Sequence, residues 1–152
     1  MPSASRWNLS FNFTVQFRKQ KIMFLILHII LMATSTLGII AGISTALFFR
    51  KKKSWLKIHK TVNSLSLLGM AAGIIMAFLY VSGTNGEHID GLHQITALTA
   101  FNLAVTTLLL GFYQFQAQKK LAVRTAHRWI GRFSLLLFLT AITLGLMLIN
   151  II

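Results

Sequence analysis

Four histidines are placed where they could ligate metal-containing cofactors. Each of four long apolar stretches contains one of them, a short distance after the stretch begins: His28, His59, His93 and His127. Neutral imidazole nitrogens bind iron well, and two imidazoles fill both axial positions of a six-coordinate b-type haem. A lone histidine of this kind more often makes a hydrogen bond between helices. Four at matched positions in apolar surroundings instead predict two haem sites, because ionisable groups there are costly and usually functional.

Other residues near these histidines fit the same prediction. Gly131 lies one helical turn after His127, where a larger side chain would strike a ring ligated by that histidine. Cationic residues that could pair with haem propionates cluster near the second and fourth histidines: Arg50, Lys57, Lys60, Arg128 and Arg132. The chain has no cysteine, which excludes covalent c-type attachment. The fifth histidine, His88, is in a turn-rich segment and is expected to be solvated.

The composition indicates the bilayer as the solvent. Hydrophobic residues make up 55% of the 152 residues and charged residues only 11%, which is too apolar for a soluble domain. Fifteen Lys and Arg face two acids. These cations form short clusters between apolar runs, without aromatic residues interleaved for stacking on bases. We therefore expect contacts with lipid headgroups and no nucleic-acid partner.

The apolar stretches predict an all-α protein, an integral membrane four-helix bundle with antiparallel up-down topology. Residues 22–152 form this domain, and residues 1–21 precede it as an extension. The expected spans are residues 22–49, 54–82, 92–116 and 126–152. Neighbouring helices must alternate in direction because the connections between them are short. His28 and His93 should then face each other near one membrane surface, with His59 and His127 near the other.

The distribution of charge predicts the topology. The loops at 50–60 and 116–128 contain many Lys and Arg, whereas the middle loop contains none. The positive-inside rule places these two loops in the cytoplasm and both termini outside. Arg18, Lys19 and Lys21, which precede the first span, oppose this assignment.

Residues 7–17 alternate apolar and polar side chains, which is the period of a β-strand. Such a segment could add a strand to a partner's sheet. A loose interfacial segment, or an extension upstream of a true start at Met23, accounts for the pattern equally well.

Three motifs resemble those of the cytochrome b561 family, in particular the four-helix core that accompanies DOMON modules. Residues 28–32 (HIILM) are similar to the family's opening H-G-x-L-M, Trp55 with His59 to its W-x-x-x-H, and residues 127–132 (HRWIGR) to its H-x-x-x-G-R. The resemblance covers roughly residues 25–150. It implies that His28 with His93 ligates one haem and His59 with His127 the other.

Two positions depart from the family pattern. Ile29 replaces the glycine after the first histidine, and residues 91–95 (GLHQI) lack the S-L-H-S-W of members that use ascorbate. The outer helices of six-helix members and a DOMON domain are also absent from the chain. The resemblance therefore implies a minimal core, for which a partner supplies the remainder, either in a larger complex or in a homodimer.

The predicted function is transmembrane electron transfer by two b-type haems, with electrons moving between donors and acceptors on opposite faces. Quinone, ascorbate, ferric iron or a redox partner protein are the candidate donors and acceptors. One alternative is a quinone-reactive cytochrome b anchor of a larger dehydrogenase. Another is a small transporter or a structural four-helix bundle, but proton-coupled exporters need a carboxylate within the membrane. Both acids, Glu87 and Asp90, are instead in the middle loop.

Overall fold

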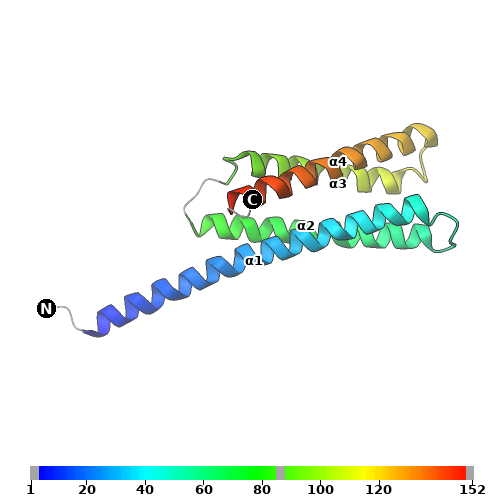
Figure 1. Ribbon diagram of the computed structural model, residues 1–152. Coiled ribbons are helices and arrows are strands. Elements are labelled where there is room, and N and C mark those ends of the chain that lie inside the picture. The colour runs from blue at the N-terminus through cyan, green and yellow to red at the C-terminus, as the bar shows by residue number, and fades with distance from the viewer. Residues whose placement is uncertain (1–3, 85–87, 150–152) are drawn as a thin grey trace.

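Four long helices form an antiparallel bundle in this computed structural model, which describes residues 4–84 and 88–149 and, within these ranges, the side chains of residue 16 and of residues from 18 onward. The helices are α1 (Ala4–Phe48), α2 (Trp55–Ser82), α3 (Leu92–Tyr113) and α4 (Lys120–Leu148). Successive helices run up and down (Figure 1), and the described ranges contain no strand. The predicted all-α four-helix membrane bundle is confirmed.

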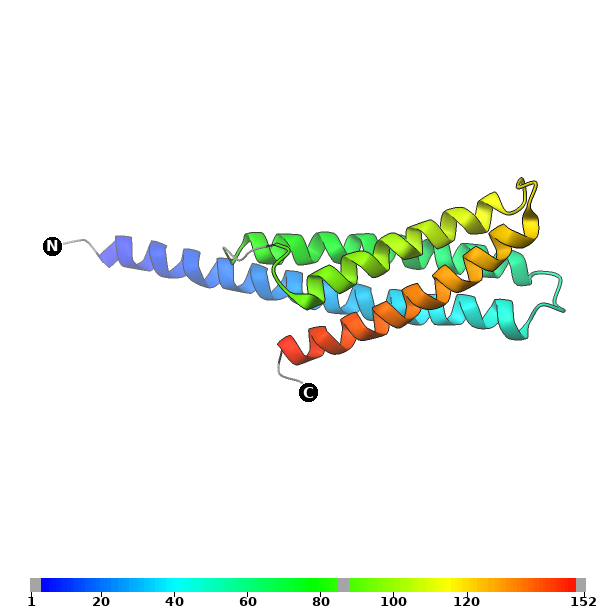
Figure 2. The same ribbon diagram turned by 90° about the horizontal axis from the view of Figure 1, so that it is seen from above.

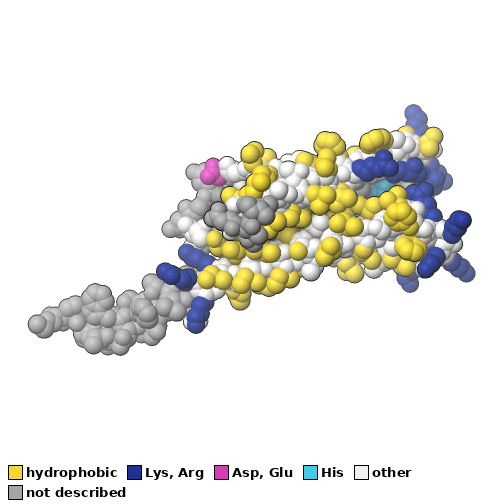
Figure 3. Space-filling model, viewed as in Figure 1, with side chains coloured by type: hydrophobic (Ala, Val, Ile, Leu, Met, Phe, Trp, Pro, Cys, Tyr) yellow, Lys and Arg dark blue, Asp and Glu magenta, His cyan; other side chains and the backbone are white. Residues whose placement is uncertain are grey.

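Apolar side chains cover the outside of the bundle. All four helices are long and apolar enough to cross a membrane, with mean hydropathies of 1.8 to 2.2 over their most apolar windows. Figure 3 shows hydrophobic side chains along the middle of the molecule and Lys and Arg gathered toward its ends. Few large side chains are fully buried; Met70 and Phe138 are the largest. Such a surface is stable against lipid tails and not against water.

The bundle consists of two helical hairpins. Helices α1 and α2 pack against each other along their length, as do α3 and α4, whereas α2 and α3 meet at few points. Small residues allow the close approach within the first hairpin, where Gly69 faces the hydroxyl of Ser35 and Gly38 faces that of Ser66. Figure 2 shows the α3–α4 hairpin crossing over the α1–α2 hairpin. The buried cluster of Met70, Ala100 and Phe138 joins the two hairpins near mid-length.

Helix α1 is longer than a bilayer requires. It has 45 residues and is continuous through residues 7–17, so the strand that the alternating pattern suggested there is wrong. A lone strand leaves its backbone hydrogen-bonding groups unpaired, whereas a helix satisfies them internally. The helix also runs without a break through residue 21, the expected end of the extension. Its first part projects past the end of α2 (Figure 1), and the side chain of Lys21 lies beside Gly83 at that end.

Two other predicted boundaries are wrong by several residues. Helix α3 ends at Tyr113 instead of residue 116, because the chain turns there and the side-chain amide of Gln114 donates to the carbonyl of Gly111. Helix α4 begins at Lys120 instead of residue 126. Its first two turns carry exposed basic residues, so hydropathy underestimated its length.

Candidate functional site

Four half-buried histidines face each other in two pairs across the space between the hairpins. The ring centroids of His28 (α1) and His93 (α3) are 6.4 Å apart, and those of His59 (α2) and His127 (α4) are 6.3 Å apart. The ring planes of the two pairs are at 88° and 79°. These are the pairs that the alternation of helix direction predicts. Each hairpin contributes one histidine to each pair.

A hydrogen bond orients each ring on the neighbouring helix of its own hairpin. The Nδ1 atom of His28 is 2.8 Å from the carbonyl oxygen of Gly73, and that of His59 is 2.8 Å from the oxygen of Gly42. In the second hairpin, His93 Nδ1 is 2.9 Å from the oxygen of Ala141 and His127 Nδ1 is 2.8 Å from that of Thr107.

The four hydrogen bonds determine which ring nitrogen carries the proton. A carbonyl oxygen only accepts, so an Nδ1 that is hydrogen-bonded to it is the donor; the side-chain nitrogen of Asn63 also lies 3.2 Å from Nδ1 of His59. In a neutral ring with its proton on Nδ1, Nε2 has a lone pair available. Metal-ligating histidines commonly have this arrangement, in which the second nitrogen donates to a carbonyl that fixes the ring and raises its basicity.

The ring separation matches that of two imidazoles bound to one metal ion. A metal–imidazole nitrogen bond of about 2.0 to 2.1 Å, with the ring centroid about 1.2 Å behind that nitrogen, places two trans centroids about 6.4 Å apart. Both pairs have this separation. The described residues contain no group of three or more His, Cys, Asp or Glu side chains that could hold a bare ion. A pair of imidazoles suits a metal whose other ligands come from a macrocycle.

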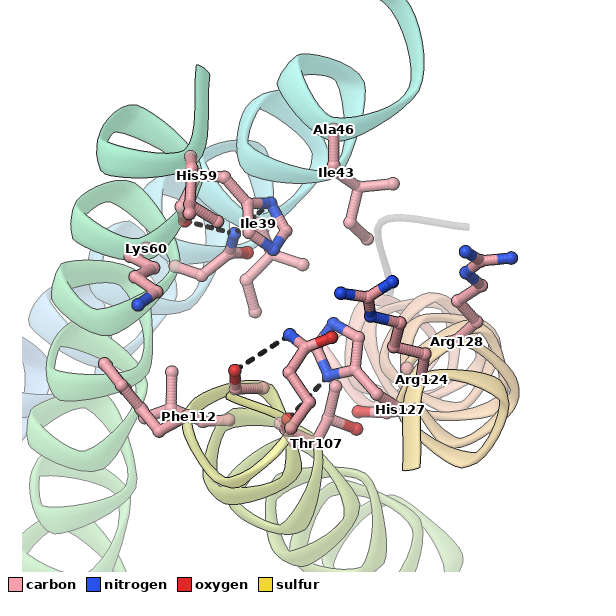
Figure 4. Close-up of a pocket in the computed structure, with 18 of the residues that line it drawn as sticks. Ile39, Ile43, Ala46, His59, Lys60, Thr107, Phe112, Arg124, His127 and Arg128 are labelled. Atoms are coloured by element: carbon pink, nitrogen blue, oxygen red, sulfur yellow. Dashed lines mark hydrogen bonds between the residues drawn. The ribbon is translucent and has the colours of Figure 1, made fainter. Parts of the chain in front are cut away.

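A cavity of about 650 Å³ opens around His59 and His127. Its volume is in the range of about 300 to 1,000 Å³ that is usual for cofactor and ligand sites. Residues of all four helices line it, and none of them is acidic. Figure 4 shows His59 and His127 on opposite sides of this space, and in Figure 3 a histidine is visible from outside between basic side chains.

Five of the six non-histidine residues that the sequence predicted for this site line the cavity: Arg50, Lys60, Arg128, Gly131 and Arg132. The sixth, Lys57, is exposed and is not among the lining residues. The Arg50 side chain bonds back to the carbonyl of Ala46 at the end of α1. Lys60 lies over two aromatic rings of the other hairpin, 5.2 Å from the centroid of Phe112 and 4.1 Å from that of Phe115. The cations near this site are therefore held partly by their own helices and by aromatic neighbours.

Gly131 lies at the contact between α3 and α4. A Cβ atom there would be 3.1 Å from Cγ2 of Thr107, the residue whose carbonyl accepts from His127. A bulky side chain at this position would therefore press on the helix that orients the ring, as well as reduce the cavity that Gly131 lines.

Arg124 belongs to the site and was missed from the sequence, and the glycines Gly111 and Gly145 lie beside two of the histidine rings. Arg124 lines the cavity, and its four-residue spacing from Arg128 was a usable signal for a shared helix face. Figure 4 shows its guanidinium beside His127. A Cβ at Gly111 would be 3.0 Å from Cε1 of His127, and one at Gly145 would be 2.9 Å from Cε1 of His93.

The other histidine pair borders a smaller space. A cavity of about 310 Å³ opens beside His93, with an apolar lining that includes Leu144 and Met147. Nearby, the side-chain oxygen of Gln94 is buried and has no hydrogen-bond partner among the described residues. His88 is exposed and belongs to neither pair; its ring stacks on Phe78 at 5.0 Å.

Comparisons of the chain with protein-family models, with curated proteins and with solved structures found no match.

Proposed function

We propose that this protein is a di-haem b-type cytochrome that transfers electrons across a membrane, similar to the four-helix core of the cytochrome b561 family. The observation that carries the proposal is the pair of histidine pairs: two facing imidazoles at 6.4 Å and two at 6.3 Å, each with Nδ1 on a backbone carbonyl. When bound, each haem supplies a one-electron redox centre.

The residues of this chain bind the haems and exclude water from them. His28 with His93, and His59 with His127, would each hold one haem through two imidazole nitrogens, and two such strong ligands favour a low-spin iron. Apolar helix faces would place each haem in low-dielectric surroundings, which affects its redox potential. The cluster of Met70, Ala100 and Phe138 joins the hairpins in the middle of the bundle, between the levels of the two histidine pairs.

The cationic residues around the larger cavity suit the propionates of a haem held by His59 and His127. Arg50, Lys60, Arg124, Arg128 and Arg132 line this cavity without an acidic residue among the lining side chains. Two carboxylates placed there would gain charge-assisted hydrogen bonds. Gly131 contributes by leaving space at the same level.

The surfaces at which electrons are exchanged follow from the topology that we propose. The end of the bundle with the α1–α2 and α3–α4 connections, called the basic end, would face the cytoplasm under the positive-inside rule. The opposite end, with the connection between α2 and α3, would face outward and is called the middle-loop end. A soluble reductant, a partner protein or ferric iron would exchange electrons at these two surfaces.

Haem content tests the proposal directly. Purified protein should contain two haems per chain by the pyridine haemochrome assay, with b-type absorption bands on reduction, since four histidines provide the axial ligands of two irons. A haem content below one per chain in protein expressed with ample haem would refute the function. Replacing all four histidines by alanine gives the matched haem-free control.

One observation favours quinone as an electron donor or acceptor at the middle-loop end. The apolar space beside His93 is open to a lipid-soluble molecule. The side-chain oxygen of Gln94, which has no hydrogen-bond partner among the described residues, lies beside Gly91 of its lining and could accept a hydrogen bond from a quinol hydroxyl. This is the arrangement that a membrane anchor of a dehydrogenase would need. Reduction of the purified haems by a quinol, slowed in Gln94→Leu at unchanged haem content, would support it; reduction at an unchanged rate would exclude this role for Gln94.

A further inference from the structure

The four helices repeat one pattern of spacing. In each helix, a carbonyl that accepts a hydrogen bond lies 14 residues after the histidine of that helix. The donor of this hydrogen bond is the histidine of the other helix in the same hairpin. The pairs of residue numbers are 28 and 42, 59 and 73, 93 and 107, and 127 and 141. At 1.5 Å per residue, this spacing separates the two levels of histidines by about 21 Å along the bundle.

A small residue follows each acceptor by four positions. These residues are Ala46, Ala77, Gly111 and Gly145. In an α-helix a side chain leans back over the preceding turn, so the residue at i+4 covers the carbonyl of residue i. A small residue there leaves this carbonyl open to a group from another helix. Gly or Ala at this position is therefore what lets each histidine ring reach its acceptor.

The two glycines contact the rings most closely. The Cβ of an alanine at position 111 would lie 3.0 Å from Cε1 of His127, and one at position 145 would lie 2.9 Å from Cε1 of His93. A Cβ so close requires the ring to shift or to turn, while its Nδ1 is hydrogen-bonded to the carbonyl of Thr107 or Ala141. The glycine and the acceptor carbonyl together determine where the ring lies and how its plane is turned.

We propose that Gly111 and Gly145 are positioning residues for haem ligation, each fixing the plane and the Nδ1 hydrogen bond of one axial histidine. This inference rests on the proposed function. Gly111 acts on the pair His59 and His127, and Gly145 on the pair His28 and His93. In each pair, the glycine-backed ring is held nearly perpendicular to its partner ring, at 79° and 88°.

Displacing a ring should shift the midpoint potential of its haem in a predictable direction. The Nδ1 hydrogen bond raises the basicity of the ligand and so stabilises the oxidised iron. Weakening this hydrogen bond should raise the midpoint potential of that haem alone. We expect the ratio of reduced to oxidised haem at a fixed potential to change about tenfold, which corresponds to about 59 mV for a one-electron couple. The angle between the two imidazole planes should change as well, and the largest g value of the oxidised haem reports this angle.

The experiment compares Gly111→Ala and Gly145→Ala with the unmodified protein by redox titration and by electron paramagnetic resonance, after haem content and folded yield have been measured. Each variant should shift the potential and the g value of one haem, and the two variants should affect different haems. Gly69→Ala is the matched control, because its added Cβ would meet the hydroxyl of Ser35 and no histidine. It should leave both haems unchanged.

The outcomes separate the two proposals. If the unmodified protein lacks haem, the proposed function fails. If it contains two haems and Gly111→Ala leaves both potentials and both g values unchanged at full occupancy, the positioning role is overturned. Equal changes in both haems, or loss of folded protein in both glycine variants, would also overturn it, because a residue that only allows helix packing would have that effect.

Discussion

Nδ1 of each paired histidine is hydrogen-bonded to the other helix of its own hairpin. Under the proposed function, Nε2 of the same ring would be the haem ligand. Because the acceptors are main-chain carbonyls, no acidic residue is needed within the membrane to orient the rings. This explains how a chain with only two acids can position four imidazoles in an apolar bundle.

Alanine substitutions should therefore remove haems in pairs. We expect His28→Ala and His93→Ala to abolish one haem, and His59→Ala and His127→Ala to abolish the other, because loss of either axial ligand leaves iron five-coordinate and weakly held. Haem stoichiometry and redox titration of the four variants measure this. His88→Ala serves as the control, since His88 is exposed and outside both pairs. Equal losses in His28→Ala and His59→Ala would contradict the pairing.

At the scale of elements, charge is concentrated at the ends of particular helices. The start of α4 presents Arg124, Arg128 and Arg132 at four-residue intervals, so they share one face toward the cavity. The connection between α1 and α2 carries Arg50 and three lysines. The same residues could orient the protein in the membrane and stabilise propionates, and these two roles are compatible.

Cysteine labelling tests the proposed orientation. The chain has no native cysteine, so a cysteine introduced at Lys52 or Lys120 is the only thiol in its variant. Both positions are exposed at the basic end. An impermeant reagent should leave them unlabelled in intact cells and label them after lysis, whereas His88→Cys should be labelled from outside. Labelling at position 52 in intact cells would invert the assignment and exchange the donor and acceptor faces.

The whole molecule is two hairpins that touch each other little. Contacts within α1–α2 and within α3–α4 are extensive, while the hairpins meet mainly through the cluster of Met70, Ala100 and Phe138, the α2–α3 contacts and the cation–π contacts of Lys60. Each histidine pair joins one residue from each hairpin. Two groups, one bound by each pair, would therefore link the hairpins at two further levels along the bundle.

Removal of haem should accordingly destabilise the bundle. A ligand that binds only the folded state at a thousandfold excess over its Kd adds about 4 kcal/mol of stability. Protein expressed under haem limitation should unfold at a lower temperature than haem-loaded protein, as followed by circular dichroism in the same detergent. The four-alanine variant provides the control, because its unfolding temperature should not respond to haem supply. Equal unfolding temperatures for loaded and haem-limited protein would contradict the bridging role.

The sequence alone determined the number of helices, their antiparallel order and the one histidine in each, because hydropathy and short connections leave little freedom in a bilayer. It also located four of the five cations that line the larger cavity, and missed Arg124. The alternating pattern at residues 7–17 suggested a strand, but the segment is helical. A helix pairs its backbone hydrogen-bonding groups internally, whereas a lone strand leaves them unpaired. The tertiary structure alone decided which carbonyl each Nδ1 reaches and which glycines touch the rings. These contacts depend on the register between packed helices, which sequence patterns within one helix do not encode.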